Sequence, residues 1–246
     1  MDARSPAALN PERIALFLDV DGTLIDFAPR PGDVVVPDGL VDDLASAERR
    51  LGGALALLSG RTIDDLDRLF APLRLRIGGI HGAEIRDTPR GVGVAAFHGR
   101  LPESAWRDLA ELLRDYPGTF TENKGVSFTV HFPPEMAPAS ALRSALEALA
   151  SRYAELDLEL VDGRRVYELK PRAFDKGEAI HRFMAQKPFA GRRPVFVSDS
   201  RIDQAGFEAA LEHGGMAFSV GDGISGLNGN FSTPGAVRAW LRQLAQ

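Results

Sequence analysis

The first 80 residues alternate between short apolar runs and segments in which apolar residues recur at helical spacing. The pattern predicts strands at 14–18, 54–58 and 75–80 and helices at 40–51 and 63–70. Asp38 and Thr62 precede the two helices, where a side-chain oxygen can accept a hydrogen bond from the first turn. Because the strands are short and apolar throughout, they indicate a parallel sheet that helices cover on both faces.

This alternation breaks after about residue 85. A hairpin at 85–87 and 92–97 precedes further elements, predicted as a helix at 102–116, strands at 119–122 and 126–132, a helix at 139–153, and strands at 156–161 and 166–169. Asp162 and Gly163 are expected to form the turn between the last two strands. Such an order predicts an α+β unit whose helices lie on one face of an antiparallel sheet.

The parallel pattern resumes after Pro171. It predicts a helix from about Lys176, a strand at 195–197, a helix at 206–211, a strand at 216–220 and a closing helix at 236–244. We therefore expect an α/β fold in which residues 1–100 and 171–246 form a doubly wound parallel-sheet core. Residues 101–170 are expected to form an inserted α+β cap.

The first strand ends in two carboxylates one residue apart, Asp19 and Asp21, followed by Gly22 and Thr23. Open α/β sheets bind ligands at the carboxyl ends of their strands. Alternate residues of a strand point the same way, so the two carboxylates suit one shared site. Such a pair of hard oxygen ligands favours Mg²⁺, and a carboxylate can also attack phosphorus to give an aspartyl-phosphate.

These carboxylates have two other interpretations. An acidic turn without chemistry is one alternative, and it stays open on these residues alone. A calcium loop is the other, and its spacing fails. With Asp19 at the first position, the required glycine would be Leu24 and the bidentate glutamate would be Arg30.

Two further polar residues stand at the ends of predicted elements. Ser59 ends the second strand, ahead of Gly60 and a helix N-terminus, where a hydroxyl can bind a phosphoryl oxygen; plain turns carry the same residues. Lys176 begins a helix behind Asp175, a position where a lysine is usually a solvated side chain. The helix dipole disfavours a cation there, so we expect Lys176 to have an anionic partner elsewhere in the fold.

Composition narrows the class of protein. The chain has 246 residues, 44% of them hydrophobic and 26% charged, as in a soluble globular protein with one core and a modest insertion. It has no cysteine, which excludes disulfides and thiolate metal sites. The net charge of −5 comes without a basic cluster, which argues against nucleic acid. No signal peptide or apolar run of about 18 residues is present, so we expect a cytoplasmic monomer that binds a small molecule and no membrane.

The run from Asp19 to Thr23 resembles the Asp-x-Asp-Gly-Thr signature of phosphatases in the haloacid dehalogenase superfamily. The resemblance implies that Asp19 is the nucleophile and that Asp21 is the general acid and base. It assigns Ser59 to the second motif of the superfamily. It makes Lys176 the third-motif lysine, which neutralises the phosphoryl group and the nucleophile.

The fourth motif of the superfamily supplies acids for Mg²⁺. Asp199 and Asp203 match it in spacing. The resemblance implies a metal shell formed by the Asp19 carboxylate, the Asp21 backbone carbonyl and Asp199, together with phosphate and water.

Several stretches narrow the resemblance to the trehalose-6-phosphate phosphatases. They are Gly-Ile-His-Gly-Ala-Glu at 79–84, Glu-Asn-Lys-Gly at 122–125, Val-His at 130–131, Tyr-Glu-Leu-Lys-Pro at 167–171 and Lys-Gly-Glu-Ala at 176–179. The similarity covers about residues 12–242. It implies that Glu122, Lys124 and Glu168 hold the glucose hydroxyls, a task to which carboxylates are suited as hydrogen-bond acceptors. The other substrate-binding residues that it implies are Thr23, Gly60, Arg61 and His81.

The chain also departs from the family pattern. In the fourth motif, Ser198, Ser200, Ile202 and Gln204 replace a glycine, an acid, a threonine and an acid, and after His131 the usual Tyr-Arg is Phe132-Pro133. The resemblance implies a Mg²⁺-dependent enzyme that hydrolyses trehalose 6-phosphate through an aspartyl-phosphate. Two alternatives stay open: a related phosphatase for another sugar phosphate, and a regulatory homologue that binds the sugar phosphate but turns it over poorly.

Overall fold

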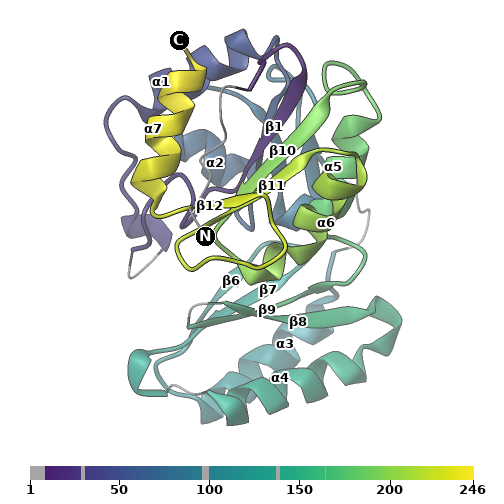
Figure 1. The fold of residues 1–246 in the computed structure, drawn as a ribbon. Helices are drawn as coiled ribbons and strands as arrows, with labels where there is room; N and C mark the ends of the chain where they lie inside the picture. The colour runs from purple at the N-terminus through teal and green to yellow at the C-terminus, as the bar shows by residue number, and fades with distance from the viewer. Residues whose placement is uncertain (1–8, 29–30, 96–99, 137–138, 164) are drawn as a thin grey trace. The chain divides into compact units, whose positions relative to one another are not determined.

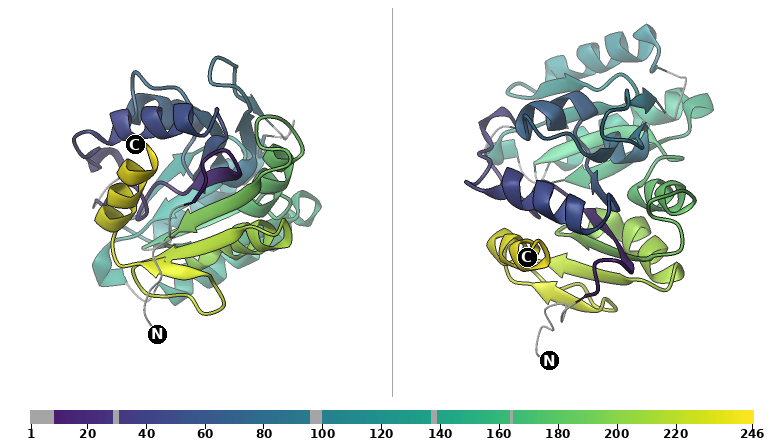
Figure 2. Two further views of the ribbon diagram at one scale, coloured as in Figure 1. Left: turned by 45° about the horizontal axis from the view of Figure 1, so that its top comes forward. Right: turned by 90° about the horizontal axis from the view of Figure 1, so that it is seen from above.

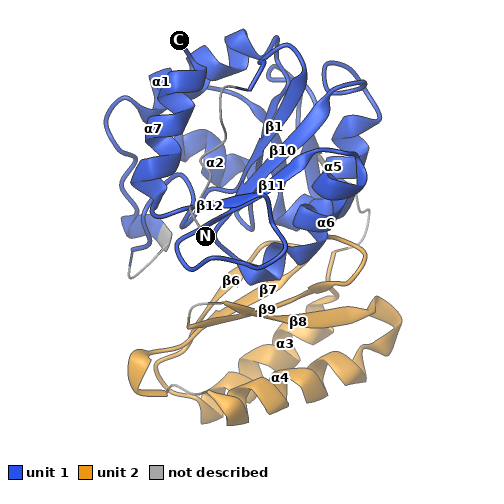
Figure 3. Ribbon diagram, in the orientation of Figure 1, with its two compact units in different colours: residues 1–96, 175–246 blue, residues 97–174 orange. Residues whose placement is uncertain are grey.

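The computed structural model describes residues 9–28, 31–95, 100–136, 139–163 and 165–246. The chain divides into two compact units, residues 1–96 with 175–246 and residues 97–174 (Figure 3). The boundaries expected from the sequence fell after residues 100 and 170. Within the described part of the chain, no helix has the length and apolar character needed to cross a membrane.

The larger unit contains an eight-stranded sheet in the order β12-β11-β10-β1-β2-β3-β4-β5 (Figure 1). Its strands are β1 (Ile14–Leu18), β2 (Leu55–Leu58), β3 (Arg76–Gly79), β4 (Glu84–Arg86), β5 (Val94–Ala95), β10 (Arg193–Ser198), β11 (Met216–Val220) and β12 (Gly229–Phe231). The strands from β12 to β3 run parallel, and the predicted hairpin of β4 and β5 adds an antiparallel edge. The strand order reverses at β1, which pairs with β2 and with β10, and open α/β sheets bind ligands at such a reversal.

Helices cover both faces of this sheet. α1 (Leu40–Arg50), α2 (Ile63–Leu69) and α7 (Pro234–Leu244) pack on the face that carries Leu16 and Leu18. α5 (Lys176–Met184) and α6 (Gln204–Glu212) pack on the opposite face, which carries Ala15 and Phe17 (Figure 2). Alternate residues of β1 therefore enter two separate cores, and this is why all five of its residues are apolar.

The smaller unit combines a four-stranded antiparallel sheet with two helices. The sheet order is β6-β7-β9-β8, with β6 (Phe120–Asn123), β7 (Phe128–His131), β8 (Leu158–Gly163) and β9 (Val166–Pro171). α3 (Glu103–Leu112) and α4 (Ser140–Arg152) share a core with Phe128, Val130 and Leu169. Since alternate residues of a strand face opposite ways, Thr129 and Glu168 belong to the helix-free face of this sheet.

Three local expectations were wrong. Asp38 does not cap α1, because the residue at the N-cap is Gly39. Asp162 and Gly163 belong to β8 and pair with β9, so the turn follows them. The third error was to miss β12, whose glycine and asparagine have low strand propensity and which is held by its ladder to β11.

The expected cap of α2 was confirmed. The Thr62 side chain accepts a hydrogen bond from the backbone N–H of Asp65.

The structure also contains short 3-10 helices that the sequence pattern did not predict. They lie at Pro31–Asp33, Ile80–Gly82, Leu113–Asp115, Pro134–Met136, Ala154–Leu156 and Arg201–Asp203.

Candidate active site

Asp19 and Lys176 form a buried ion pair at the carboxyl end of β1. The Nζ atom of Lys176 lies 2.5 Å from Oδ1 of Asp19, and each residue is only 5% exposed. Asp19 directly follows β1, and Lys176 is the first residue of α5. The anionic partner that we expected for Lys176 is therefore the residue implied as the nucleophile.

Asp203 contacts the same lysine. Its Oδ2 atom lies 2.6 Å from Nζ of Lys176 and also accepts a hydrogen bond from the Ser198 hydroxyl. The motif resemblance had matched Asp203 to the acids that bind Mg²⁺. In the structure the Asp203 carboxylate instead forms an ion pair with Lys176. Although burial disfavours its charged form, the carboxylates of Asp19 and Asp203 raise the pKa of Lys176 above its ordinary value.

Thr23 connects Asp19 with the end of β10. Its hydroxyl donates to Oδ2 of Asp19 at 2.9 Å and accepts from the backbone N–H of Asp199 at 3.0 Å. Gly22 has a φ of 80°, and a Cβ atom there would lie 2.3 Å from Oδ2 of Asp199. Only glycine therefore allows the Asp199 carboxylate to approach the loop after β1 so closely.

Burial makes these carboxylates hard to ionise. It raises the pKa of Asp19 to about 8, against the lowering effect of Lys176, and Asp203 and Asp199 raise it further. Burial also raises the pKa of Asp199 to about 6. The carboxylates of Asp19, Asp199 and Asp203 outnumber the single lysine among them, so this part of the site has an excess of negative charge.

The donor set fits a hard divalent cation. Asp19 and Asp199 supply carboxylate oxygens, each directly after one of the neighbouring strands β1 and β10. Mg²⁺ commonly uses one or two carboxylates, with water and phosphate oxygens completing its shell. Among the described residues, no group of three or more His, Cys, Asp or Glu side chains could hold a metal ion.

Asp21 faces a different partner. Its Oδ2 and Oδ1 atoms lie 2.7 Å from Nε and Nη2 of Arg61, in a two-pronged ion pair. The prediction that Asp19 and Asp21 point the same way depended on the strand continuing, but β1 ends at Leu18 and the chain turns there. Arg61, implied as a substrate-binding residue, holds the carboxylate implied as the general acid.

The ends of β2 and β3 meet beside this pair. Ser59 follows β2 and is buried, and its hydroxyl accepts from the backbone N–H of Arg61 at 3.1 Å. Ile80 and His81 have left-handed backbones, with φ of 46° and 55°, and their N–H groups donate to the carbonyls of Arg61 and Ser59. A Cβ atom on Gly60 would lie 2.8 Å from Nε2 of His81, so these residues pack together. Strained backbone of this kind is concentrated at functional sites.

The smaller unit brings two of its three predicted residues together. Lys124 Nζ lies 3.2 Å from Oε2 of Glu168, whose Oε1 accepts from the Ser127 hydroxyl at 2.7 Å. Glu122 instead interacts with Nε2 of His131 at 3.0 Å. Ser127 and His131 were not assigned roles from the sequence, and the signal that could have found them is their alternation with apolar residues across 126–132.

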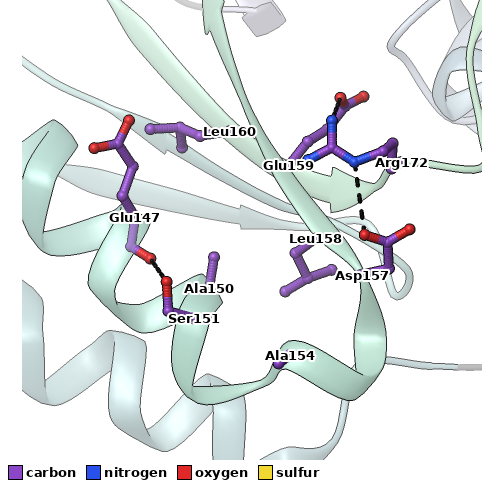
Figure 4. A pocket seen from close by; sticks show the side chains of 9 residues that line it. All are labelled: Glu147, Ala150, Ser151, Ala154, Asp157, Leu158, Glu159, Leu160 and Arg172. Carbon is purple, nitrogen blue, oxygen red and sulfur yellow. Dashed lines mark hydrogen bonds and ion pairs between the residues drawn. The ribbon is translucent and has the colours of Figure 1, made fainter.

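A shallow pocket of the smaller unit lies away from these residues. It has a volume of about 470 Å³ and is lined by α4, the segment after it, β8 and Arg172 (Figure 4). Arg172 pairs there with Asp157 and Glu159. No residue that the sequence assigned to the site lines this pocket, so it supplies no part of the candidate active site.

The fold indicates the class of protein. It is similar to the fold of a solved phosphatase of the haloacid dehalogenase superfamily from Bacteroides thetaiotaomicron, with a TM-score of 0.63 at 15% identity. A solved structure of the C-terminal domain of the C. albicans trehalose-6-phosphate phosphatase superposes with a TM-score of 0.79 at 20% identity, covering 95% of this chain and 93% of that one. At that identity the likeness shows the fold alone.

Sequence comparison shows the family. The Trehalose-phosphatase family model matches residues 17–230. The trehalose-6-phosphate phosphatase of Escherichia coli (strain K12) is 37% identical over 94% of this chain and 86% of its own length. A probable trehalose-phosphate phosphatase of Sinorhizobium fredii is 36% identical over 94% and 87%. The chain belongs to the trehalose-phosphatase family, and the phosphatases of its superfamily are generally metal-dependent.

Proposed function

We propose that the chain hydrolyses trehalose 6-phosphate to trehalose and inorganic phosphate, using Mg²⁺ and an aspartyl-phosphate on Asp19. The observation that carries the proposal is the buried Asp19–Lys176 ion pair. It lies after β1, where the strand order reverses, and the chain belongs to the trehalose-phosphatase family. We further propose that the protein acts as a cytoplasmic monomer. Phosphate release from trehalose 6-phosphate, measured with and without Mg²⁺, tests the activity.

Asp19 is proposed as the nucleophile. An oxygen of its carboxylate forms a bond to phosphorus while the bond from phosphorus to the sugar oxygen breaks. Water then attacks the aspartyl-phosphate, releases phosphate and restores the carboxylate. Lys176 and the Ser59 hydroxyl are proposed to stabilise the negative charge of the equatorial phosphoryl oxygens, because phosphoryl transfer is catalysed mainly by positioning and charge.

Asp21 is proposed to protonate the departing sugar oxygen and later to take a proton from the attacking water. In the structure both of its carboxylate oxygens accept from Arg61. Proton transfer therefore requires this pair to open. A phosphoryl group is a natural competitor for Arg61, since guanidinium binds phosphate and carboxylate with the same two-pronged geometry.

Asp19 and Asp199, with the backbone carbonyl of Asp21, are the proposed holders of Mg²⁺. When bound, the ion would lower the pKa of both carboxylates and neutralise charge on the phosphoryl oxygens. Thr23 supports this arrangement because its hydroxyl fixes an oxygen of Asp19 and the backbone of Asp199.

The sugar is proposed to be recognised by Glu122, Lys124 and Glu168 of the smaller unit. Carboxylates accept hydrogen bonds from hydroxyls, and a site built to make such bonds discriminates strongly against substrates without them. Comparison of turnover on trehalose 6-phosphate with sucrose, mannose and glucose phosphates tests this substrate choice. Faster turnover of one of these would favour a related sugar phosphatase.

The altered fourth motif favours a second candidate, a regulatory homologue. Ser200 accepts a hydrogen bond from the backbone N–H of Ile202, and Gln204 donates to Glu208. These residues organise the start of α6 and leave Asp199 as the acid beside Asp19. Binding of trehalose 6-phosphate without phosphate release at saturating Mg²⁺ would establish this candidate.

A further inference from the structure

The helix-free face of the smaller sheet carries a row of three side chains from three adjacent strands. In the strand register, Thr129 of β7 pairs with Glu122 of β6 on one side and with Glu168 of β9 on the other. Paired residues of antiparallel strands project from the same face about 5 Å apart. Thr129 therefore stands between the two carboxylates proposed to bind the sugar.

Thr129 differs from its neighbours in its hydrogen bonding. Thr129 is 3% exposed, and its buried hydroxyl has no hydrogen-bond partner among the described residues. By contrast, Glu168 accepts from Ser127 and Lys124, and Glu122 interacts with His131. A buried hydroxyl without a partner destabilises a fold, whereas a valine of the same shape would remove that cost.

The unsatisfied hydroxyl therefore indicates a partner that the described residues do not supply. We propose that Thr129 is a further substrate-binding residue, whose hydroxyl forms a hydrogen bond with the glucosyl part of the substrate between Glu122 and Glu168. The inference rests on the proposed function, because it needs a polyhydroxylated substrate. It adds a neutral donor and acceptor to a row that otherwise carries charged groups.

The hydroxyl is covered in this structure, so a neighbour moves when the sugar binds. Glu122 has the room to do so, because its side chain is 34% exposed and β6 is an edge strand. A sugar hydroxyl that draws the Glu122 carboxylate from His131 would open the space beside Thr129. Binding of the sugar would then replace the contact between Glu122 and His131 and give the Thr129 hydroxyl a hydrogen-bond partner.

Kinetics of three variants test this inference. Thr129→Val removes the hydroxyl and keeps the shape, Thr129→Ser keeps the hydroxyl, and Thr121→Val is the matched control on β6, where Thr121 pairs with Val130 on the helix-covered side. With trehalose 6-phosphate, Thr129→Val is expected to lower kcat/KM about tenfold through KM, Thr129→Ser to restore most of it, and the control to change nothing. Turnover of p-nitrophenyl phosphate should be equal in all four proteins. The melting temperature of Thr129→Val should equal or exceed that of the wild type.

Four results would overturn the inference. An unchanged kcat/KM for trehalose 6-phosphate in Thr129→Val would show that the hydroxyl makes no contact with substrate. Equal losses on both substrates, or a lower melting temperature, would show a structural role. A wild type that turns over p-nitrophenyl phosphate but not trehalose 6-phosphate would instead refute the substrate assignment, and the role of Thr129 with it.

Discussion

In the larger unit the charged residues of the site lie at strand ends and helix starts, whereas in the smaller unit they lie along the face of a sheet. Asp19, Asp203 and Lys176 are each 5% exposed, and the lysine contacts both carboxylates directly. In the smaller unit the side chain of Glu122 is 34% exposed and that of Lys124 is 11% exposed. Removal of one charged side chain should therefore lower the free energy of unfolding by different amounts in the larger and the smaller unit.

The comparison separates two tasks. Strand ends and helix starts are fixed by the backbone, which suits groups that must hold a reacting phosphorus within a narrow geometry. Side chains on a sheet face can be exchanged without disturbing the ladder beneath them, which suits recognition of different sugars. Substitutions in the larger unit should therefore affect every phosphate ester, and those in the smaller unit only sugar phosphates.

The largest effect is expected from Asp19→Asn. The amide keeps the size of the side chain but is not a nucleophile, so turnover of every substrate should fall by about 10⁴-fold or more. Steady-state phosphate release measures the loss, and circular dichroism checks that the fold survives. Turnover close to that of the wild type would refute the covalent mechanism.

Lys176→Met should rank second and should also weaken the fold. It removes a charge that stabilises the phosphoryl group, which typically costs about 10²–10³-fold in kcat. It also leaves Asp19 and Asp203 buried without their cation, a change that costs about 3–5 kcal/mol in unfolding free energy. Urea denaturation measures the second effect.

Lys124→Met is the matched control in the smaller unit. Glu168 keeps its hydrogen bond from Ser127, so the loss in unfolding free energy should be about 1 kcal/mol. If the two lysine variants lost equal stability, the difference that we draw between strand ends and sheet face would be unfounded.

Alanine at Glu122, Lys124 or Glu168 should produce a loss that depends on the substrate. Each removes a charged hydrogen bond to the sugar, so kcat/KM for trehalose 6-phosphate should fall by about 1–3 kcal/mol, roughly 5–150-fold. An aryl phosphate has no glucose hydroxyls, so its hydrolysis should be nearly unchanged. Equal losses on both substrates would remove the argument for sugar recognition.

The smallest effect is expected from Ser200→Asp. Aspartate can keep the hydrogen bond to the N–H of Ile202, so the fold should not change. An added carboxylate near Asp199 should lower the Mg²⁺ concentration required by about tenfold, the lower end of the usual effect of residues around metal ligands. A Mg²⁺ titration of phosphate release measures it.

Asp199→Ala is the companion variant, and it should nearly abolish activity. An inert wild type at saturating Mg²⁺, together with turnover by Ser200→Asp, would favour the regulatory homologue.

The division into a parallel core and an α+β insertion was predictable from the sequence. The periodicity of apolar residues is a local signal, and it placed β1, β2 and α2 to within one residue. The gathering of polar residues at the carboxyl edge of the sheet was also predictable, because strands such as β1 end abruptly in polar residues. The short strand β12 was not, since its stability comes from pairing with β11 rather than from its own residues.

The sequence by itself determined the acids after β1 and the order of the elements, because both depend on residues that are close together along the chain. Only the tertiary structure decided which charges meet. Lys176 joins Asp19 across 157 positions, Asp21 turns to Arg61, and Thr129 stands between two carboxylates. Such pairings depend on strand register and loop conformation, which arise from the packing of the whole chain and leave no periodic signal along it.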